Sequence, residues 1–224
     1  MAKRIGKYKV SKREQALSAA DGVLENGLTI NSGGLTVSTG GLTVSAGAVS
    51  TVGATNLGTT EVMSAGAGIT AGSGTVIKYG VLRVGKIITT QIFIELTGLS
   101  SGSGGDDIIG VAGASGCSIG QVTTAINGTI TAGTIQCLEI PAGGSDQVDL
   151  WYADNNAGVE DAAVTTLTNQ VNLTNTADNT LGVSGGFIVD VVLPADKYLY
   201  LVCGDAGNAV YTKGKYLITL YGTV

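Results

Sequence analysis

A seven-residue unit repeats three times near the N-terminus and limits what this part of the chain can form. Residues 27–33, 34–40 and 41–47 all follow the pattern Gly-Leu-Thr-(Ile/Val)-(Asn/Ser)-x-Gly. The period suggests a coiled coil, but each unit has two glycines, and each glycine costs a helix about 1 kcal/mol. Within a unit the apolar residues lie two positions apart, which is the spacing along one face of a β-strand. We therefore predict short strands joined by Gly-Gly turns.

One strand of this length cannot enclose a hydrophobic core, so the apolar stripe of the repeat needs a partner. We expect an oligomeric stem in which three chains wind together, as in trimeric viral fibre stems. Two alternatives stay open: a ribbon packed on the globular domain of the same chain, and a disordered linker. The residues expected at the stem interface are Leu28, Ile30, Leu35, Val37, Leu42 and Val44.

A basic arm precedes the repeat, although the formal net charge of the whole chain is −5. Residues 1–13 contain six of the twelve basic residues and no acidic residue, so they carry +6 and the remaining residues carry −11. Such an arm is attracted to a negative surface. We favour docking on an acidic protein surface, such as a capsid shell, over a solvated tail. Binding to nucleic acid is disfavoured because the acidic body would repel phosphate.

In an extended arm, Tyr8 and Val10 would alternate with Lys7 and Lys9, an arrangement that suits addition to the edge of a partner's sheet. The residues expected to anchor the arm are Lys3, Arg4, Lys7, Tyr8, Lys9, Lys12 and Arg13.

The sequence contains no histidine, which excludes Ser-His-Asp, Cys-His and zinc–histidine chemistry. Its three cysteines, Cys117, Cys137 and Cys203, are odd in number and widely spaced, so we expect small buried hydrophobes instead of a disulfide scaffold. Neither a secretory signal nor an apolar run of about 20 residues is present, and no membrane association is expected. We predict a chain without enzymatic activity, catalytic residues or cofactor.

The C-terminal two-thirds are predicted to form a β-sandwich that is jelly-roll-like. Glycine accounts for 36 of 224 residues, and β-branched residues are frequent, a mix that favours short strands and tight turns. The expected strands are residues 81–84, 87–96, 108–111, 121–126, 129–131, 134–140, 148–152, 186–193, 197–203 and 215–221. We thus predict an all-β chain with an extended arm over residues 1–20, a Gly-rich stem or linker of short-strand repeats over 21–80, and a sandwich over 81–224.

Several segments of the sandwich contain candidate sites. Residues 154–161 resemble the start of a calcium loop but lack its full spacing, so an exposed turn is favoured and no metal is predicted. A carboxylate-based glycan hydrolase, which we do not expect, would draw on Asp106, Asp107, Glu160 and Asp161.

Aromatic residues in the sandwich have two interpretations. Trp151 beside Tyr152 would form a sugar platform only if exposed, and a core tryptophan is favoured. In residues 197–203, Leu199 shares one face with Leu201 and Cys203, whereas Tyr198 and Tyr200 share the other face. One face should be core, and the tyrosines could then lie at a subunit interface.

The basic leader of residues 1–14, the Gly-Leu-Thr repeats and the Gly/Thr-rich β-domain together resemble small virion proteins of tailed bacteriophages, especially marine podovirus-like ones. The clearest likeness covers residues 1–50. The resemblance implies a head decoration protein or head fibre, often a homotrimer, that binds the major capsid protein or another virion protein and is assembled in the host cytoplasm. The alternative is a tail-associated fibre protein that recognises host surface glycan.

Overall fold

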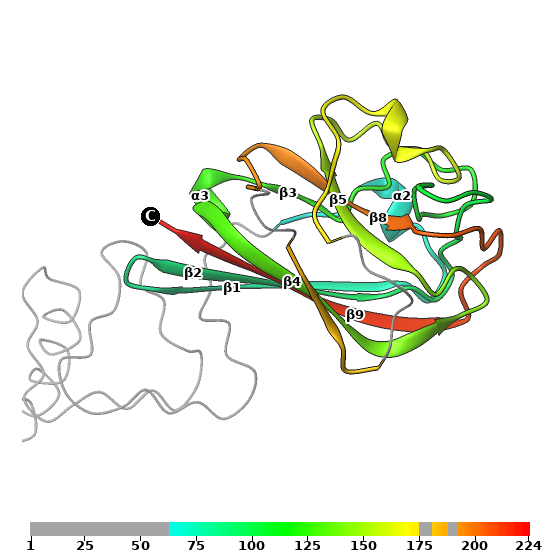
Figure 1. The fold of residues 1–224 in the computed structure, drawn as a ribbon, viewed down its shortest axis with the longest axis horizontal. Helices are drawn as coiled ribbons and strands as arrows, with labels where there is room; N and C mark the ends of the chain where they lie inside the picture. The colour runs from blue at the N-terminus through cyan, green and yellow to red at the C-terminus, as the bar shows by residue number, and fades with distance from the viewer. Residues whose placement is uncertain (1–62, 175–180, 188–191) are drawn as a thin grey trace, which may run out of the picture. The chain divides into compact units, whose positions relative to one another are not determined.

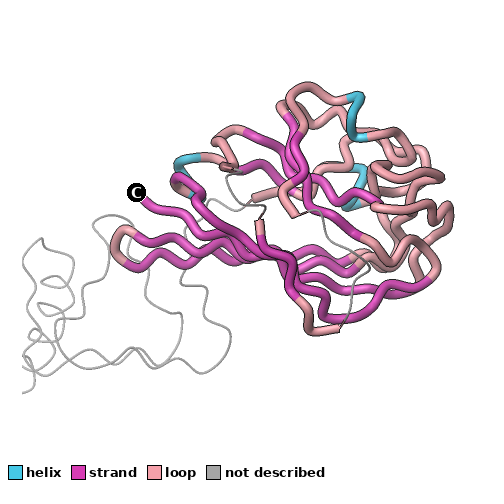
Figure 2. Tube along the Cα trace, in the orientation of Figure 1, coloured by secondary structure: helices cyan, strands magenta, loops and turns pink. Residues whose placement is uncertain are grey.

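The chain folds into two antiparallel β-sheets in the computed structural model, which describes residues 63–174, 181–187 and 192–224 (Figures 1 and 2). Helical segments of the described residues are single turns: α2 (Ala67–Thr70), α3 (Thr124–Asn127) and the 3-10 turn η1 (Val164–Thr166). The prediction of an all-β fold is confirmed.

Five strands form one sheet, in the order β1-β2-β9-β4-β7, and four form the other, in the order β3-β8-β5-β6. The bounds in the first sheet are β1 (Val76–Val84), β2 (Ile87–Glu95), β9 (Lys213–Thr223), β4 (Thr129–Ala142) and β7 (Ser184–Gly186). Those in the second sheet are β3 (Gly120–Val122), β8 (Lys197–Cys203), β5 (Val148–Ala153) and β6 (Val171–Asn172).

The pairing of the strands is nested. β2 pairs with β9, β3 with β8, β4 with β7, and β5 with β6, all antiparallel. A long hairpin whose strand pairs alternate between two sheets in this way is an eight-stranded jelly roll, to which β1 adds an edge strand beside β2. The predicted jelly-roll-like sandwich is therefore confirmed, with β1 as an addition.

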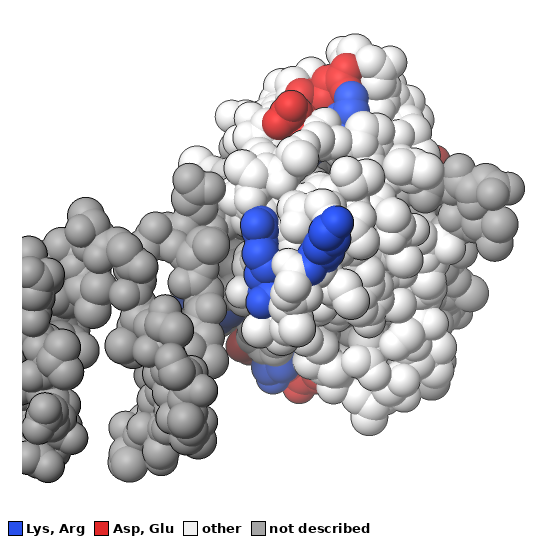
Figure 3. All heavy atoms as spheres, turned by 90° about the vertical axis from the view of Figure 1, so that its left-hand side faces the viewer, with Lys and Arg blue, Asp and Glu red and all other residues white. Residues whose placement is uncertain are grey.

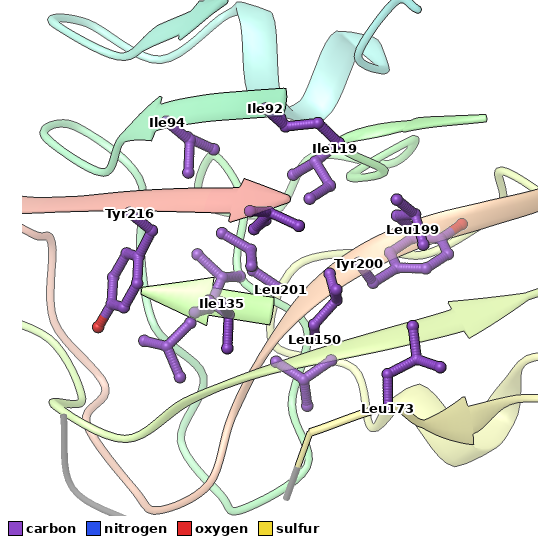
Figure 4. Packing of buried hydrophobic residues seen from close by; sticks show 14 of the residues in the cluster. Ile92, Ile94, Ile119, Ile135, Leu150, Leu173, Leu199, Tyr200, Leu201 and Tyr216 are labelled. Carbon is purple, nitrogen blue, oxygen red and sulfur yellow. The ribbon is translucent and has the colours of Figure 1, made fainter. Parts of the chain in front are cut away.

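The hydrophobic core lies between the two sheets, where alternate residues of each strand point inward (Figure 4). Ile92, Ile94, Ile135 and Tyr216 come from the five-stranded sheet, and Leu150, Leu199 and Leu201 come from the four-stranded sheet. Each of these side chains is at most 2% exposed. Burying one aliphatic side chain of this size stabilises a fold by about 1.5–3 kcal/mol.

The β1–β2 hairpin is closed by the two residues Gly85 and Lys86, because Val84 pairs directly with Ile87. Gly85 has a φ of 60° and occupies the first central position of the turn. A type II′ turn requires a positive φ at this position, and its twist matches that of the flanking strands. The hairpin projects beyond the rest of the sandwich, next to the end of β9 (Figure 1).

Some expected strands have different bounds. The strand predicted at 121–126 is wrong beyond Val122, because Thr123 begins the helical turn α3: its Oγ1 accepts from the Ile126 amide at 3.3 Å, and its own amide donates to Asn127 Oδ1 at 2.9 Å. The strands predicted at 129–131 and 134–140 are one strand, β4, interrupted by bulges. The strand expected at 186–193 overlaps β7 at Gly186, and residues 188–191 of this prediction lie outside the described residues.

The sandwich also begins earlier than residue 81. That position lies inside β1, and Met63 and Ile69 already belong to the core, at 3% and 0% exposure. The segment is rich in glycine and has few large apolar residues, so its contribution to the core was not predicted from the sequence. Within residues 63–80, which we assigned to the Gly-rich stem, these apolar side chains pack into the sandwich.

A loop over residues 154–163 covers the outer face of the four-stranded sheet, which corrects the expectation for Tyr200. This side chain is 0% exposed, and its hydroxyl donates to the Asn155 carbonyl oxygen at 2.5 Å and accepts from the Gly158 amide at 3.4 Å. Tyr198, two positions earlier on the same face, is half-buried. Thus β8 is buried on both faces over most of its length, and Tyr200 is part of the core and not of a subunit interface.

Candidate interaction surface

The predicted anchoring and stem residues lie outside the described residues, so their assignments stay predictions. The other candidates can be placed. They are the loop carboxylates, the segment after β5, Trp151, and the outer surface of the five-stranded sheet.

Two of the candidate catalytic carboxylates hold a glycine-rich turn. Asp107 Oδ2 accepts from the Gly104 amide at 2.6 Å, and Asp161 Oδ1 accepts from the Ser103 amide at 2.5 Å. The Ser103 amide is the main reason why the pKa of Asp161 lies below its ordinary value. A general acid in glycoside hydrolysis needs a raised pKa, so this arrangement suits a structural brace and not proton donation.

The two neighbouring candidates act elsewhere. Glu160 is 8% exposed, and its Oε2 accepts from the Gly113 amide at 2.7 Å in a different turn. Asp106 has a φ of 66°, and its backbone amide donates to the Cys203 carbonyl oxygen at 2.7 Å. Asp107 and Asp161 therefore bind the same turn, whereas Asp106 and Glu160 form hydrogen bonds with other parts of the chain.

The segment that resembles a calcium loop uses its first carboxylate in an ion pair. Asp154 binds the Lys197 ammonium group and accepts from Asn169 Nδ2 at 2.6 Å. Lys197 is the main cause of the lowered pKa of Asp154, followed by Asn169. Within residues 63–174, 181–187 and 192–224, no group of three or more acidic or cysteine side chains is placed to hold a metal ion.

Trp151 is half-buried on the outer face of β5 and packs against the core. Its Nε1 is buried and has no hydrogen-bond partner among the residues that the structure describes. This placement agrees with a tryptophan that packs mainly against the core.

On the outer face of the five-stranded sheet, the chemistry and exposure of the described side chains differ from one end to the other. Directly paired residues share a face, so the register defines the rows of side chains on this surface. Near the β1–β2 hairpin one row is Leu82-Thr89-Tyr221 and the next is Val84-Ile87-Thr223. Neither row contains a charged side chain.

Four large apolar side chains in these two rows form what we call the hairpin patch. Their exposed fractions are 54% for Leu82, 64% for Val84, 60% for Ile87 and 44% for Tyr221. Figure 3 faces this end of the domain and shows mostly uncharged atoms, with a few basic side chains near the middle and acidic side chains at the top and bottom. A contiguous exposed apolar surface of this kind indicates a contact site, because water solvates it poorly.

The far end of the same face carries charged side chains, three of which form ion pairs within the domain. Lys215 Nζ lies 2.7 Å from Glu139 Oε2 and 4.0 Å from Glu95 Oε1. The hydrogen bond to Lys215 is the main cause of the lowered pKa of Glu139, and it raises the pKa of Lys215. The outer face of this sheet is thus apolar at the hairpin end, whereas the other end contains ion pairs.

The described part of the chain begins at the end of the sandwich that carries the hairpin patch. Met63 is 3% exposed, and its sulfur accepts from Asn127 Nδ2 at 3.4 Å. Asn127 also donates to Thr90 Oγ1 at 3.0 Å, and its carbonyl oxygen lies against Gly222, next to the row that ends in Thr223. The chain that precedes residue 63 therefore joins the sandwich near the hairpin patch.

The hairpin patch was not predicted from the sequence, although the residues around the turn carry a signal for it. Residues 81–88 read Val-Leu-Arg-Val-Gly-Lys-Ile-Ile, so apolar residues occupy both alternating faces on each side of the turn. A strand with one solvated face normally alternates apolar and polar residues. Apolar residues at both parities therefore indicate either a covered strand or an exposed contact surface.

In the described part of the chain, no helix has the length and apolar character that crossing a membrane would require. Comparison of the chain with protein-family models, with curated proteins and with solved structures found no match.

Proposed function

We propose that this chain is a structural virion protein that binds the surface of a phage head through its N-terminal arm and decorates or stabilises the shell. The observation that carries the proposal is the charge division between a +6 arm and an acidic jelly-roll body. The arm would dock on an acidic shell, and the sandwich would project from it as one of several identical subunits.

Two features of the sandwich support this proposal. Its loop carboxylates brace turns or pair with lysine, as Asp107, Asp161 and Asp154 do. Its described residues bury a hydrophobic core between the two sheets, so we expect the arm to serve as an attachment and not to be needed for folding. Jelly rolls are common among viral structural proteins, which is an analogy of fold and not of site.

Deletion of residues 1–20 tests the anchor. We expect the truncated protein to keep the circular dichroism spectrum of the sandwich and to lose binding to phage particles in a co-sedimentation assay. Full binding by the truncated protein would contradict the anchoring role.

Two sets of substitutions, one that removes basic residues from the arm and one that removes them from the body, sharpen the test. Replacing the basic residues of 1–13 by glutamine should weaken particle binding strongly, and the binding of the parent protein should fall with added salt. Replacing the exposed body residues Lys78, Lys86 and Lys213 by glutamine should change binding little. Equal losses from both sets would indicate a non-specific charge effect.

Electron microscopy of particles labelled with an antibody to this chain tests the location. Label over the head is the expected result. Label confined to the tail would instead favour a tail-associated receptor-binding protein, and the exposed Tyr221 would then be the first residue to test for contact with glycan.

A further inference from the structure

We propose that the hairpin patch of Leu82, Val84, Ile87 and Tyr221 is the surface through which copies of this chain contact one another. The inference deepens the proposed function, on whose homo-oligomer it rests, by naming the surface that the copies bury. The occupant of the patch is a second copy of the same chain.

The first argument is the chemistry of the surface. Four large apolar side chains stand on one side of three adjacent strands, β1, β2 and β9, and threonines complete their rows. Each exposes between 44% and 64% of its surface, although inward-facing Ile88, next to Ile87, is 0% exposed. Burying these side chains in a contact would favour association by about 25 cal/mol for each Å² of apolar surface removed from water.

The second argument is charge. The described residues contain eleven acidic and six basic side chains, so two copies of the sandwich repel each other at long range. Copies can make close contact only where the surface carries no acid, and no charged side chain lies in either row of the patch. The charged residues that border the patch in sequence, Arg83 and Lys86, are exposed and basic, so they would attract and not repel a second acidic sandwich.

The third argument is position. Residues 1–62 join the sandwich at Met63, which is held by Asn127 beside Gly222, at the end where the patch lies. If residues 28–44 form the predicted stem, only residues 45–62 separate it from the sandwich. Tethering by a short segment gives an effective concentration in the mM range, so a patch of modest area can associate. Copies tethered in this way could then associate through the patch.

Cysteine cross-linking of the full-length chain tests the contact. Val84→Cys places a thiol in the patch, and Val210→Cys places one at a position of similar exposure, 64% against 52%, near the opposite end of β9. The native cysteines are buried and serve as an unreactive background. With a short bis-maleimide, we expect covalent oligomers from Val84→Cys and at least tenfold less from Val210→Cys.

A second pair of variants measures the energetic role of the patch. The double variant Leu82→Glu/Ile87→Glu should raise the dissociation constant of the oligomer at least tenfold in sedimentation velocity, whereas Val210→Glu should leave it within twofold. The variant Leu82→Thr/Ile87→Thr introduces polar but uncharged side chains that suit a β-strand, and it should also weaken association. Thermal unfolding verifies that each variant is folded.

Three results on self-association would overturn the inference. They are a monomeric parent chain, an oligomer whose dissociation constant is unchanged in both double variants, and equal cross-linking at positions 84 and 210. Particle binding is measured in parallel, because it reports on the arm. If the patch variants lose particle binding but still self-associate, the patch contacts the capsid and the inference is refuted. If only the deletion of residues 1–20 gives an unexpected result, because the truncated protein still binds particles, the proposed function alone is refuted.

Discussion

The hydroxyl of Tyr200 donates a hydrogen bond to the carbonyl oxygen of Asn155 at 2.5 Å and thereby fastens the loop of residues 154–163 to the outer face of β8. The same oxygen accepts from the Gly158 amide at 3.4 Å. Burial raises the pKa of Tyr200 to about 12, so the hydroxyl stays protonated and keeps its donor hydrogen at any physiological pH. One buried side chain thus joins a strand to a loop more than 40 residues away in the sequence.

Removing this hydroxyl should destabilise the sandwich. In Tyr200→Phe, the carbonyl of half-buried Asn155 and the buried amide of Gly158 each lose a partner, which costs about 1–3 kcal/mol of unfolding free energy. Tyr198→Phe is the matched control, because Tyr198 lies on the same face of β8 but is half-buried, so water can replace its hydroxyl. Urea unfolding of both variants measures the difference. Equal losses would mean that the loop is not held by Tyr200.

The β1–β2 turn offers a test of backbone conformation without steric contact. An added Cβ would meet nothing within 4 Å at either Gly85 or Gly80, but only Gly85 has a positive φ, of 60°. Gly85→Ala should therefore cost about 1–2 kcal/mol, the penalty for a left-handed L-residue. Gly80→Ala should be neutral or stabilising by about 0.5 kcal/mol, because alanine restricts the unfolded chain. Thermal unfolding of the two variants makes the comparison, and equal shifts would argue against a strained turn.

The sequence predicted the strands that end the domain because their periodicity is a local property. Residues 197–203 and 215–221 alternate, and Leu199 and Leu201 face the core as expected. The fate of Tyr200 could not be predicted in the same way. Its burial depends on a loop that folds over the outer face, and alternation within β8 says nothing about what lies above that face.

Capping competed with β-propensity at residues 123–127. The β-branched run Val122-Thr123-Thr124 suggested that the strand continues. Reciprocal hydrogen bonds between Thr123 and Asn127 favour a helical turn instead, and Asn127 gains partners in Thr90 and Met63 that only the tertiary fold supplies. The hairpin patch was missed for a related reason, since only the register shows that its four side chains are neighbours. The assignments of the arm and stem stay predictions from sequence.

The three cysteines should be unreactive in the native protein. Burial raises the pKa of Cys117 to about 11 and that of Cys203 to about 12, and it also raises the pKa of Cys137. Thiolate, the reactive form, is therefore scarce at about pH 8, and the sulfur atoms are shielded. We expect no fast reaction with a thiol reagent in buffer and three equivalents in urea. A rapidly reacting equivalent in the native state would indicate that one of these sites opens.

The acid side of the stability profile should depend on Asp161. Its pKa is lowered mainly by the backbone amide of Ser103, so the folded state binds the ionised carboxylate more tightly than the unfolded state does. A group of this kind contributes stability above its unfolded pKa of about 3.9, and the contribution disappears as the pH falls through the lower folded value. Asp161→Asn should therefore reduce stability near neutral pH and flatten the loss of stability below about pH 4.

Asp196→Asn is the matched control for this prediction, because Asp196 and Asp161 have almost the same positive φ, 61° and 62°, and asparagine tolerates that conformation. A change seen in both variants would come from the backbone, whereas a change seen only in Asp161→Asn would come from the carboxylate that Ser103 binds. Urea titrations at about pH 7, 4 and 3 supply the measurement. If the two variants keep parallel profiles with the parent across this range, the Ser103–Asp161 hydrogen bond does not stabilise the folded chain, and the glycine-rich turn is held by Asp107 alone.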